Sequence, residues 1–293
     1  MKHLKHFYLL LILTLGILLG ATVNSCRKHV HKPLVIEHFP VQVGNSWEYR
    51  RIFSVIISDT VNHDTSEYIL IDSLHEEFKG IDKLAGWECY RLLHLLFGQG
   101  HTYPKTRWYA HPDTALLWIA CLLGDISRIV EGDKFNNKIL WKGTTSFDSP
   151  HALQQYLYNV RYKKFLSFNF DTTYLSTPKK LFVFPLTINK YWVAMRDPWL
   201  EEREIIEEDS VTVPAGTFNS LRLEITSDWM EEFDLWHKWI ADEGIIKDSL
   251  YLRGIATNAQ GDTIGYFYSY DIYELLDFQT DTKGNYSSST INY

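Results

Sequence analysis

Few residues of this 293-residue chain have the type and spacing that catalysis or metal binding requires. The segment 75–79 starts with His-Glu, as the helix of a zinc protease does, but Lys79 occupies the position of the second histidine ligand. His29 and His31 could contact a metal through alternate side chains, yet two imidazoles need further ligands. No Gly-x-Ser-x-Gly turn, phosphate-binding loop or dinucleotide fingerprint occurs in the sequence. The sequence therefore predicts no catalytic residues, no metal site and no cofactor, and favours a protein that is not an enzyme.

A run of carboxylates in one short segment could hold calcium if the segment folded into a loop, because hard cations bind several oxygen ligands. The run consists of Glu201, Glu202, Glu204, Glu207, Glu208 and Asp209. On a strand, these side chains would instead divide between two faces. The favoured interpretation is a charged solvent face, or an edge strand protected from pairing with other sheets.

The N-terminus has the layout of a secretory signal. Lys2 and Lys5 give it a positive start, and residues 8–19 form an uncharged apolar run that small residues follow. A membrane span needs about 20 apolar residues, so a cleaved leader is favoured over an uncleaved anchor helix. We expect residues 1–25 to be a signal peptide.

The segment 23–26, which reads Val-Asn-Ser-Cys, resembles the lipobox of bacterial lipoproteins. This resemblance implies transfer of diacylglycerol to the Cys26 thiol, cleavage after Ser25 and acylation of the new amino group. An ordinary cleaved signal peptide is the alternative. Two or three acyl chains hold a protein stably on a bilayer, whereas one chain binds reversibly. We therefore expect Cys26 to be a lipid anchor to the membrane.

The residues after Cys26 bear on the destination of the protein. Arg27 stands where the enterobacterial sorting rule would need Asp to retain a lipoprotein at the inner membrane. The resemblance therefore implies the outer membrane. Surface display in some bacteria uses acidic residues after the cysteine, whereas Lys28 and Lys32 are basic. We expect the protein to face the periplasm on a basic tether over residues 26–38.

The net charge excludes one class of partner. The chain carries 29 Lys and Arg against 36 Asp and Glu, and removal of residues 1–25 takes away two of the lysines. A polyanion would be repelled by this field unless a basic cluster reversed it, and the folded part contains no such cluster. Nucleic-acid binding is not expected.

Two further cysteines, Cys89 and Cys121, would lie in an oxidising compartment if the protein is exported. Each occurs in an apolar stretch, so a disulfide between them and two buried free thiols are equally compatible with the sequence.

The composition and periodicity predict strands. Aromatic residues make up 15% of the chain, and Leu221, Leu223 and Ile225 alternate with polar residues, as in a strand with one buried face. Residues 213–217 contain Pro and Gly in the order typical of a hairpin turn. The fold class is therefore expected to be all-β, mainly antiparallel. The expected strands cover residues 45–57, 66–77, 87–97, 103–110 and 115–123, and then 201–213, 217–229, 233–241, 245–256 and 263–275.

Landmark residues recur in the same order in the two halves. Phe39-Pro40 precedes Trp47 with the same separation as Phe184-Pro185 precedes Trp192, and an Ala-Gly pair occurs later in each half, at 85–86 and 215–216. Self-similarity of this kind indicates an internal repeat, although aromatic-rich β proteins also produce such coincidences.

One long spacing is also shared. Arg91 precedes Trp108 by the same number of positions as Arg222 precedes Trp239, and Arg107-Trp108 matches Lys238-Trp239. We therefore predict two related β-meander units that form curved sheets, either one sheet or two domains. Ser149-Pro150 followed by apolar residues at helical spacing predicts one short connecting helix near 150–165. The expected divisions are a first β unit at 39–143, a connecting segment at 144–183, a second β unit at 184–278 and a flexible tail at 279–293.

Three motifs resemble a known group of uncharacterised envelope lipoproteins that are common in Bacteroidota. Residues 39–49 are similar to its "P-L-x-x-G-x-x-W-x-Y" start, residues 213–218 to its "V-P-A-G-T-F" turn, and residues 239–247 to its "W-Y-A-x-x-x-G-L-V-K" strand pair. Asn189 departs from the pattern, which has Gly there. The group is similar in outline to the curved sheets of periplasmic lipoprotein carriers, so the resemblance implies a sheet that can cup an acyl chain.

Aromatic residues are the remaining candidates for a ligand site. They occur in the second unit, where they could stack on sugars, line an apolar cavity or form an ordinary core: Trp229, Trp236, Trp239, Tyr266, Tyr268 and Tyr270. We expect a non-enzymatic protein that binds an apolar ligand or a partner envelope protein. A glycan-binding accessory protein is the second hypothesis, and an enzyme with an unrecognised site is the third.

Overall fold

The protein is described by a computed structural model that covers residues 32–98, 101–112, 114–123, 135, 138–142, 145–158 and 173–281. The described residues from Leu34 onward belong to one compact unit. The predicted signal peptide, Cys26, His29 and His31 lie outside the described residues, as does most of the predicted tail.

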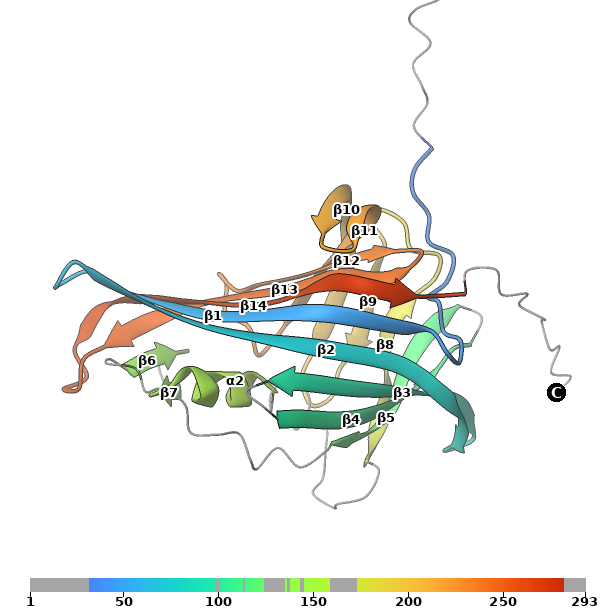
Figure 1. Ribbon diagram of the computed structural model, residues 1–293, viewed down its shortest axis with the longest axis horizontal. Coiled ribbons are helices and arrows are strands. Elements are labelled where there is room, and N and C mark those ends of the chain that lie inside the picture. Colours follow the sequence, from blue (N-terminus) through green and yellow to red (C-terminus); the bar gives the residue numbers. More distant parts are fainter. Residues whose placement is uncertain are drawn as a thin grey trace, which may run out of the picture. The chain divides into compact units, whose positions relative to one another are not determined.

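Strands of one antiparallel sheet make up most of the described chain (Figure 1). This confirms the predicted all-β fold and shows that the two halves share a single sheet. The strands are β1 (Ser46–Asp59), β2 (Asp64–Leu84), β3 (Trp87–Gly98), β4 (His101–Ala110), β5 (Ala115–Leu123), β6 (Lys138–Trp141), β7 (Thr145–Phe147), β8 (Thr173–Val183), β9 (Tyr191–Met195), β10 (Glu201–Val213), β11 (Gly216–Ser227), β12 (Leu235–Ala241), β13 (Gly244–Thr257) and β14 (Thr263–Gln279).

The order of strands across the sheet is β8-β5-β4-β3-β2-β1-β14-β13-β12-β11-β10-β9. The short β6 also pairs with β13, and β7 pairs with β6. The sheet curls until its first and last strands, β8 and β9, come into contact. The junction between β8 and the β9–β10 pair is called the seam below. β14, the last of the described strands, joins the two halves by pairing with both β1 and β13.

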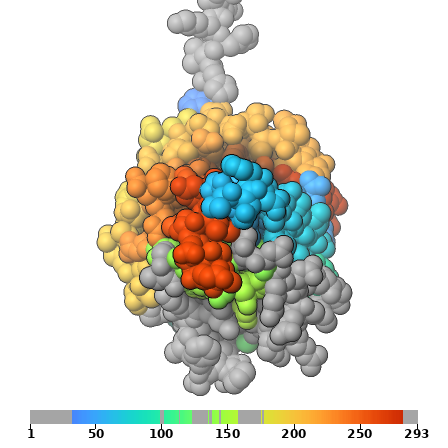
Figure 2. All heavy atoms as spheres, turned by 90° about the vertical axis from the view of Figure 1, so that its left-hand side faces the viewer, coloured from blue at the N-terminus to red at the C-terminus, as the bar shows by residue number. Residues whose placement is uncertain are grey.

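Alternation of side chains explains why these segments form strands with one face inside. In β1, Phe53, Val55 and Ile57 point to the interior and are almost fully buried, while the intervening residues point outward. β10 begins and ends at the residues that the sequence predicted. At the far end of the long strands, the tips of the β1–β2 and β13–β14 hairpins lie side by side, because Asp59 pairs with Gly265 (Figure 2).

The connecting segment contains more regular structure than predicted. Helix α2 (Pro150–Tyr158) begins as expected, and the Ser149 hydroxyl accepts a hydrogen bond from the Ala152 N–H at 3.2 Å. The rest of the predicted helix, from residue 159, lies outside the described residues. The segment also contributes β7 and β8, and β8 pairs with β5. β8 was missed because its apolar residues do not alternate regularly.

The landmarks of the two halves occupy equivalent places. Arg91 pairs with Trp108 across β3 and β4, and Arg222 pairs with Trp239 across β11 and β12. Each indole donates across the middle strand to an aspartate of the strand beyond, Trp108 to Asp82 at 2.7 Å and Trp239 to Asp209 at 2.8 Å. A duplication predicts such equivalences, and it stays a prediction.

The departure at Asn189 also has a physical explanation. Gly44 and Asn189 follow the two Phe-Pro landmarks at the same distance, and both have positive φ, 96° and 65°. Asn is among the few residues other than Gly that adopt this conformation readily. The same backbone turn is therefore kept with a different residue.

The two remaining cysteines are buried free thiols, so the predicted alternative of a disulfide between Cys89 and Cys121 is wrong. They lie on β3 and β5, which β4 separates. Adjacent strands are about 4.8 Å apart, so two strand spacings exceed the roughly 7 Å that a disulfide can bridge between Cα atoms.

Candidate functional site

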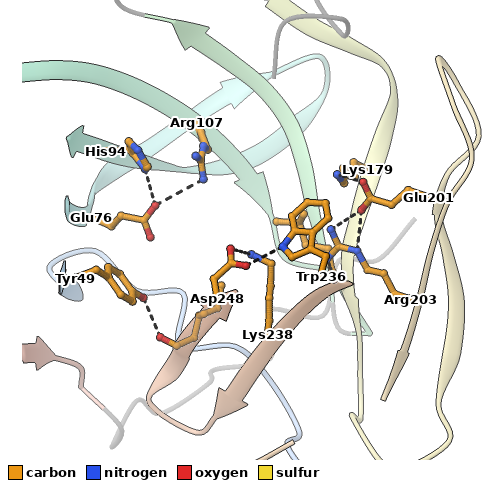
Figure 3. Close-up of polar contacts among 12 residues, drawn as sticks. Tyr49, Glu76, His94, Arg107, Lys179, Glu201, Arg203, Trp236, Lys238 and Asp248 are labelled. Atoms are coloured by element: carbon orange, nitrogen blue, oxygen red, sulfur yellow. Dashed lines mark hydrogen bonds and ion pairs between the residues drawn. The ribbon is translucent and has the colours of Figure 1, made fainter. Parts of the chain in front are cut away.

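The interior of the curled sheet contains a cavity of about 150 Å³. Side chains from β1, β2, β3, β4, β5, β8, β10, β12, β13 and β14 line it, so it draws on both halves of the chain. Much of its wall is aromatic, and the rings include Trp47, Tyr49, Phe78, Tyr109, Trp118 and Trp236. Charged side chains interrupt this wall in three clusters (Figure 3).

The first cluster joins neighbouring strands of the first half. His94 Nδ1 on β3 lies 2.7 Å from Glu76 Oε1 on β2, and Arg107 on β4 lies 3.7 Å from the same oxygen. Burial would raise the pKa of Glu76, but the hydrogen bond from His94 and the positive charges nearby lower it to about 2. Burial, with the charges of Lys105 and Arg107, lowers the pKa of His94 to about 3. At neutral pH this cluster holds a carboxylate, a neutral imidazole and a guanidinium.

The second cluster lies opposite, on β12 and β13. Lys238 Nζ lies 2.5 Å from Asp248 Oδ2, and the indole of Trp236 donates to Asp248 Oδ1 at 2.8 Å. Tyr49 approaches from β1 and donates its hydroxyl to the carbonyl of Ile245 at 3.0 Å. Burial and the nearby carboxylates Glu76 and Asp248 raise the Tyr49 pKa, which keeps this hydroxyl protonated.

The third cluster closes the seam. Glu201 on β10 accepts hydrogen bonds from Lys179 Nζ on β8 at 2.6 Å and from Arg203 Nη2 at 2.7 Å. Arg203 also donates to the carbonyl of Leu181 on β8 at 2.6 Å. Burial lowers the pKa of Lys179 to about 8 despite Glu201, while the two cations outweigh burial and lower the pKa of Glu201. Side chains therefore hold the seam together beside the cavity.

The His94 environment predicts a loss of stability in acid. An unfolded histidine takes up a proton near pH 6.5, whereas His94 in the folded protein resists protonation down to about pH 3. The unfolded state therefore binds more protons in this range, and the free energy of unfolding should fall as the pH falls from 6.5 to 3, by on the order of 5 kcal/mol. Glu76 adds a fall in the same direction below about pH 4.5.

The measurement is urea unfolding between pH 7 and pH 3 for the wild type and for His94→Gln. Gln can donate to Glu76 but does not titrate, so the variant should lose most of the slope between pH 6.5 and pH 4.5. The exposed His38 gives the matched control, His38→Gln, which should keep the wild-type slope. Equal slopes in all three proteins would contradict the role given to His94.

The tryptophans selected from the sequence lie in three different environments. Trp236 lines the cavity. Trp229 is buried in the core, where its ring centre lies 5.8 Å from that of Trp236 and 6.2 Å from that of Trp141. Trp239 donates to Asp209 and lies beneath Lys247, on the opposite side of β12 from the cavity-lining Lys238. The three tryptophans therefore do not form one surface, and their part in ligand binding stays a prediction.

The tyrosines selected from the sequence lie on the outer face of β14, since Phe267, Ser269 and Asp271 between them are buried. Tyr251 of β13 stacks on Tyr268 with ring centres 6.4 Å apart and contacts the ring of Tyr270. The Arg253 guanidinium lies 4.7 Å from the centre of the Tyr266 ring. We call Tyr251, Tyr266, Tyr268 and Tyr270 the outer tyrosine row.

The acidic run does not converge on one point. Glu201 is buried in the seam, Asp209 accepts from Trp239, and Glu207 pairs with Arg222 at 2.8 Å. Over Glu201–Glu204 the alternative of an edge strand is wrong, because this part of β10 pairs with both β9 and β11. From Glu207 to Val213, β10 pairs with β11 alone among the described strands, as the edge alternative predicts. A fully solvated face is wrong for Glu201, which is 1% exposed. Within the described ranges, no three His, Cys, Asp or Glu side chains are grouped so that they could hold a metal ion.

The charged residues of the cavity were missed by the sequence analysis, although a signal for them exists. Glu76 lies between Leu74 and Phe78 in the inward phase of β2, and all three line the cavity. A charged residue in the buried phase of a strand contradicts the hydrophobic pattern and often marks a functional site. The likeness of residues 75–79 to a zinc-protease motif suggested a helix, whereas this segment is a strand.

Among the described residues, no helix is long and apolar enough to cross a membrane. No protein-family model and no curated protein matches the chain. Two solved structures are similar to it. One is a lipoprotein candidate from Parabacteroides distasonis, with 13% identity and a TM-score of 0.33 over 83% of this chain and 99% of that one.

The other is an exported-protein candidate with a YmcC-like fold from Bacteroides fragilis, with 10% identity and a TM-score of 0.31 over 84% of this chain and 100% of that one. Similarity this low does not establish a shared fold or function.

Proposed function

We propose that this protein is a lipid-anchored, non-enzymatic protein of the bacterial envelope that binds a small amphipathic molecule inside its curled sheet. The observation that carries the proposal is the cavity of about 150 Å³, whose aromatic wall is interrupted by three ion-pair clusters. Ligand sites are typically concave and mostly apolar, with a few polar groups that orient the ligand. Protein interiors are otherwise packed with few voids larger than a water molecule.

The volume limits the size of the ligand. An apolar cavity of about 150 Å³ is large enough to bind benzene. A ring or a short chain therefore fits, whereas a complete acyl chain would need the sheet to open. This favours a small ligand over the acyl chain implied by the resemblance to lipoprotein carriers.

The ion pairs support a binding role over a catalytic one. Perturbed pKa values can mark active sites, but ion-pair networks also produce them. Here Glu76 is held ionised and His94 neutral across the neutral range, so neither is poised to exchange a proton near pH 7. The buried Lys179 has a pKa of about 8, but its ammonium is hydrogen-bonded to Glu201 and so belongs to the ion cluster that holds the seam.

The location in the envelope rests on the signal peptide and on Cys26. The lipobox supports a lipid anchor, and Arg27 supports the outer membrane, with the protein facing the periplasm. In that compartment the tether would hold the cavity near the membrane, where it could collect a ligand or pass it to a partner envelope protein.

A direct test of this proposal is to fill the cavity with a larger side chain. Leu92 is buried and lines it from β3, so Leu92→Trp should occupy much of the space and reduce the affinity for 2-phenylacetamide, a neutral ring-bearing probe, at least tenfold by calorimetry. Leu122→Trp on β5, where Leu122 is 38% exposed, should leave the affinity unchanged. Equal binding by both variants would remove the cavity as the ligand site.

The outer tyrosine row favours a second candidate function, glycan binding. Tyr251 and Tyr268 stack with an angle of 22° between their planes on the outer face, an arrangement on which sugar rings could stack. The two candidates place the ligand on opposite sides of the sheet. A glycan binder would therefore be retarded equally in polysaccharide gels with and without Leu92→Trp.

A further inference from the structure

The charges around the cavity are not balanced. Four cations line it, from β4, β8, β10 and β12: Arg107, Lys179, Arg203 and Lys238. Two carboxylates line it, Glu76 and Asp248, and Glu201 adjoins it through its contacts with Lys179 and Arg203. The imidazole of His94 contributes no charge at neutral pH, because its pKa is lowered to about 3. The cavity therefore has an excess of positive charge inside a protein whose net charge is −7.

Burial of the site strengthens the electrostatic effect of this excess positive charge. Arg203 and Lys179 are at most 5% exposed, and aromatic rings surround the cations. Charges separated from water interact far more strongly than charges on the surface. An anion in the cavity would gain from this field, whereas a cation would be repelled.

Two of the cations occupy equivalent positions in the two halves. Arg107 and Lys238 each directly precede a landmark tryptophan, Trp108 and Trp239, and both point into the cavity from their strands. Lys238 is close enough to the first cluster to lower the pKa of Glu76. Figure 3 shows these two side chains approaching the space between the clusters from different strands.

We propose that the ligand is a small carboxylate with an aromatic or short aliphatic body. Its anionic group binds beside Lys238, between Arg107 and the two cations of the seam, and its body packs on the aromatic wall. This inference rests on the proposed function, since it names the class of ligand that the same cavity takes. Charge-assisted hydrogen bonds from a guanidinium and an ammonium are the interactions that best recognise a carboxylate.

The test compares three probes of nearly equal shape on the full chain by calorimetry. Phenylacetate is anionic, 2-phenylacetamide is neutral and 2-phenylethylammonium is cationic. Phenylacetate should bind at least tenfold more tightly than the amide, because one charged hydrogen bond contributes about that much. The ammonium probe should bind most weakly. Acetate, which lacks the ring, should bind at least tenfold more weakly than phenylacetate.

Variants then test whether the preference for an anion comes from a lysine that lines the cavity. Lys238→Met should abolish the preference for phenylacetate over the amide, while Lys238→Arg should retain it. Lys247 lies on the other side of β13 and pairs with Glu274 at 3.4 Å, so Lys247→Met changes the net charge equally but should keep the preference. Thermal unfolding would verify that each variant is folded.

The possible results separate this inference from the proposed function. Equal affinities of the wild type for phenylacetate and the amide would overturn the inference, while the amide binding would still support the cavity as a ligand site. A preference that survives in Lys238→Met, or that disappears in Lys247→Met, would also overturn it. Absence of binding by all three ring-bearing probes would overturn the inference and the proposed function together.

Discussion

Replacement of Glu201 by alanine is expected to lower the free energy of unfolding by about 3–5 kcal/mol, since it leaves two buried cations without their shared carboxylate. Glu201 is 1% exposed, and it links Lys179 of β8 to Arg203 of β10 at 2.6 Å and 2.7 Å. Lys179 can respond by losing its proton, because its pKa is already lowered to about 8. Arg203 cannot, so most of the cost comes from its buried charge.

Urea unfolding at pH 7 would measure this effect. Glu207 on the same strand gives the matched control, because its side chain is 46% exposed and pairs with Arg222 on the outside. Glu207→Ala should cost less than about 1 kcal/mol. A loss in Glu201→Ala no larger than that of Glu207→Ala would show that the seam does not depend on this cluster.

A triple replacement separates stability from function. Lys179→Met, Glu201→Leu and Arg203→Met together remove all three charges, and apolar residues of similar volume often recover the stability of a buried ion cluster. The triple variant should therefore be at least as stable as the wild type. It should bind phenylacetate more weakly, because two of the four lining cations are gone.

Replacement of Cys26 by serine is expected to release the protein from the membrane, because serine cannot accept the thioether-linked diacylglycerol that the lipobox implies. Two or three acyl chains provide nearly all of the membrane affinity of a lipoprotein, so their loss should move most of the protein to the soluble fraction. Fractionation of cells after export, with an alkyne fatty acid as a metabolic label, would measure both the location and the acylation.

Cys89→Ser is the matched control, since Cys89 is a buried free thiol on β3. This variant should keep both the label and the membrane association. If Cys26→Ser remained with the membrane as fully as the wild type and still carried the label, the lipid anchor would not be on Cys26.

The sequence predicted the strands well, because apolar and polar residues alternate along each half-buried strand. The limits of β10 and β5 agree with the predicted limits, and those of β1, β3, β11, β12 and β13 differ by at most two residues at either end. Burial of alternate side chains is a local property, so it can be read without knowing the partner strand. β8 and β9 were missed because they are short or irregular in pattern and are placed by their neighbours.

The candidate site could not be predicted in the same way. Glu76, Lys179 and Lys238 are far apart in the chain, and each is an ordinary charged residue until the curled sheet brings it to the cavity. The local pattern showed that some tryptophans would be buried, but it could not separate Trp236 in the cavity wall from Trp229 in the core.

The sequence alone determined the all-β class and most strand positions, and it alone supports the predicted export signal and lipobox, since these depend on composition and on spacing along the chain. The tertiary structure decided that both halves form one sheet, that the cysteines stay apart and that charges of both signs meet in the interior. The physical reason is that strand order and sheet curvature follow from pairing between distant segments, and such pairing leaves no periodic signal in either segment.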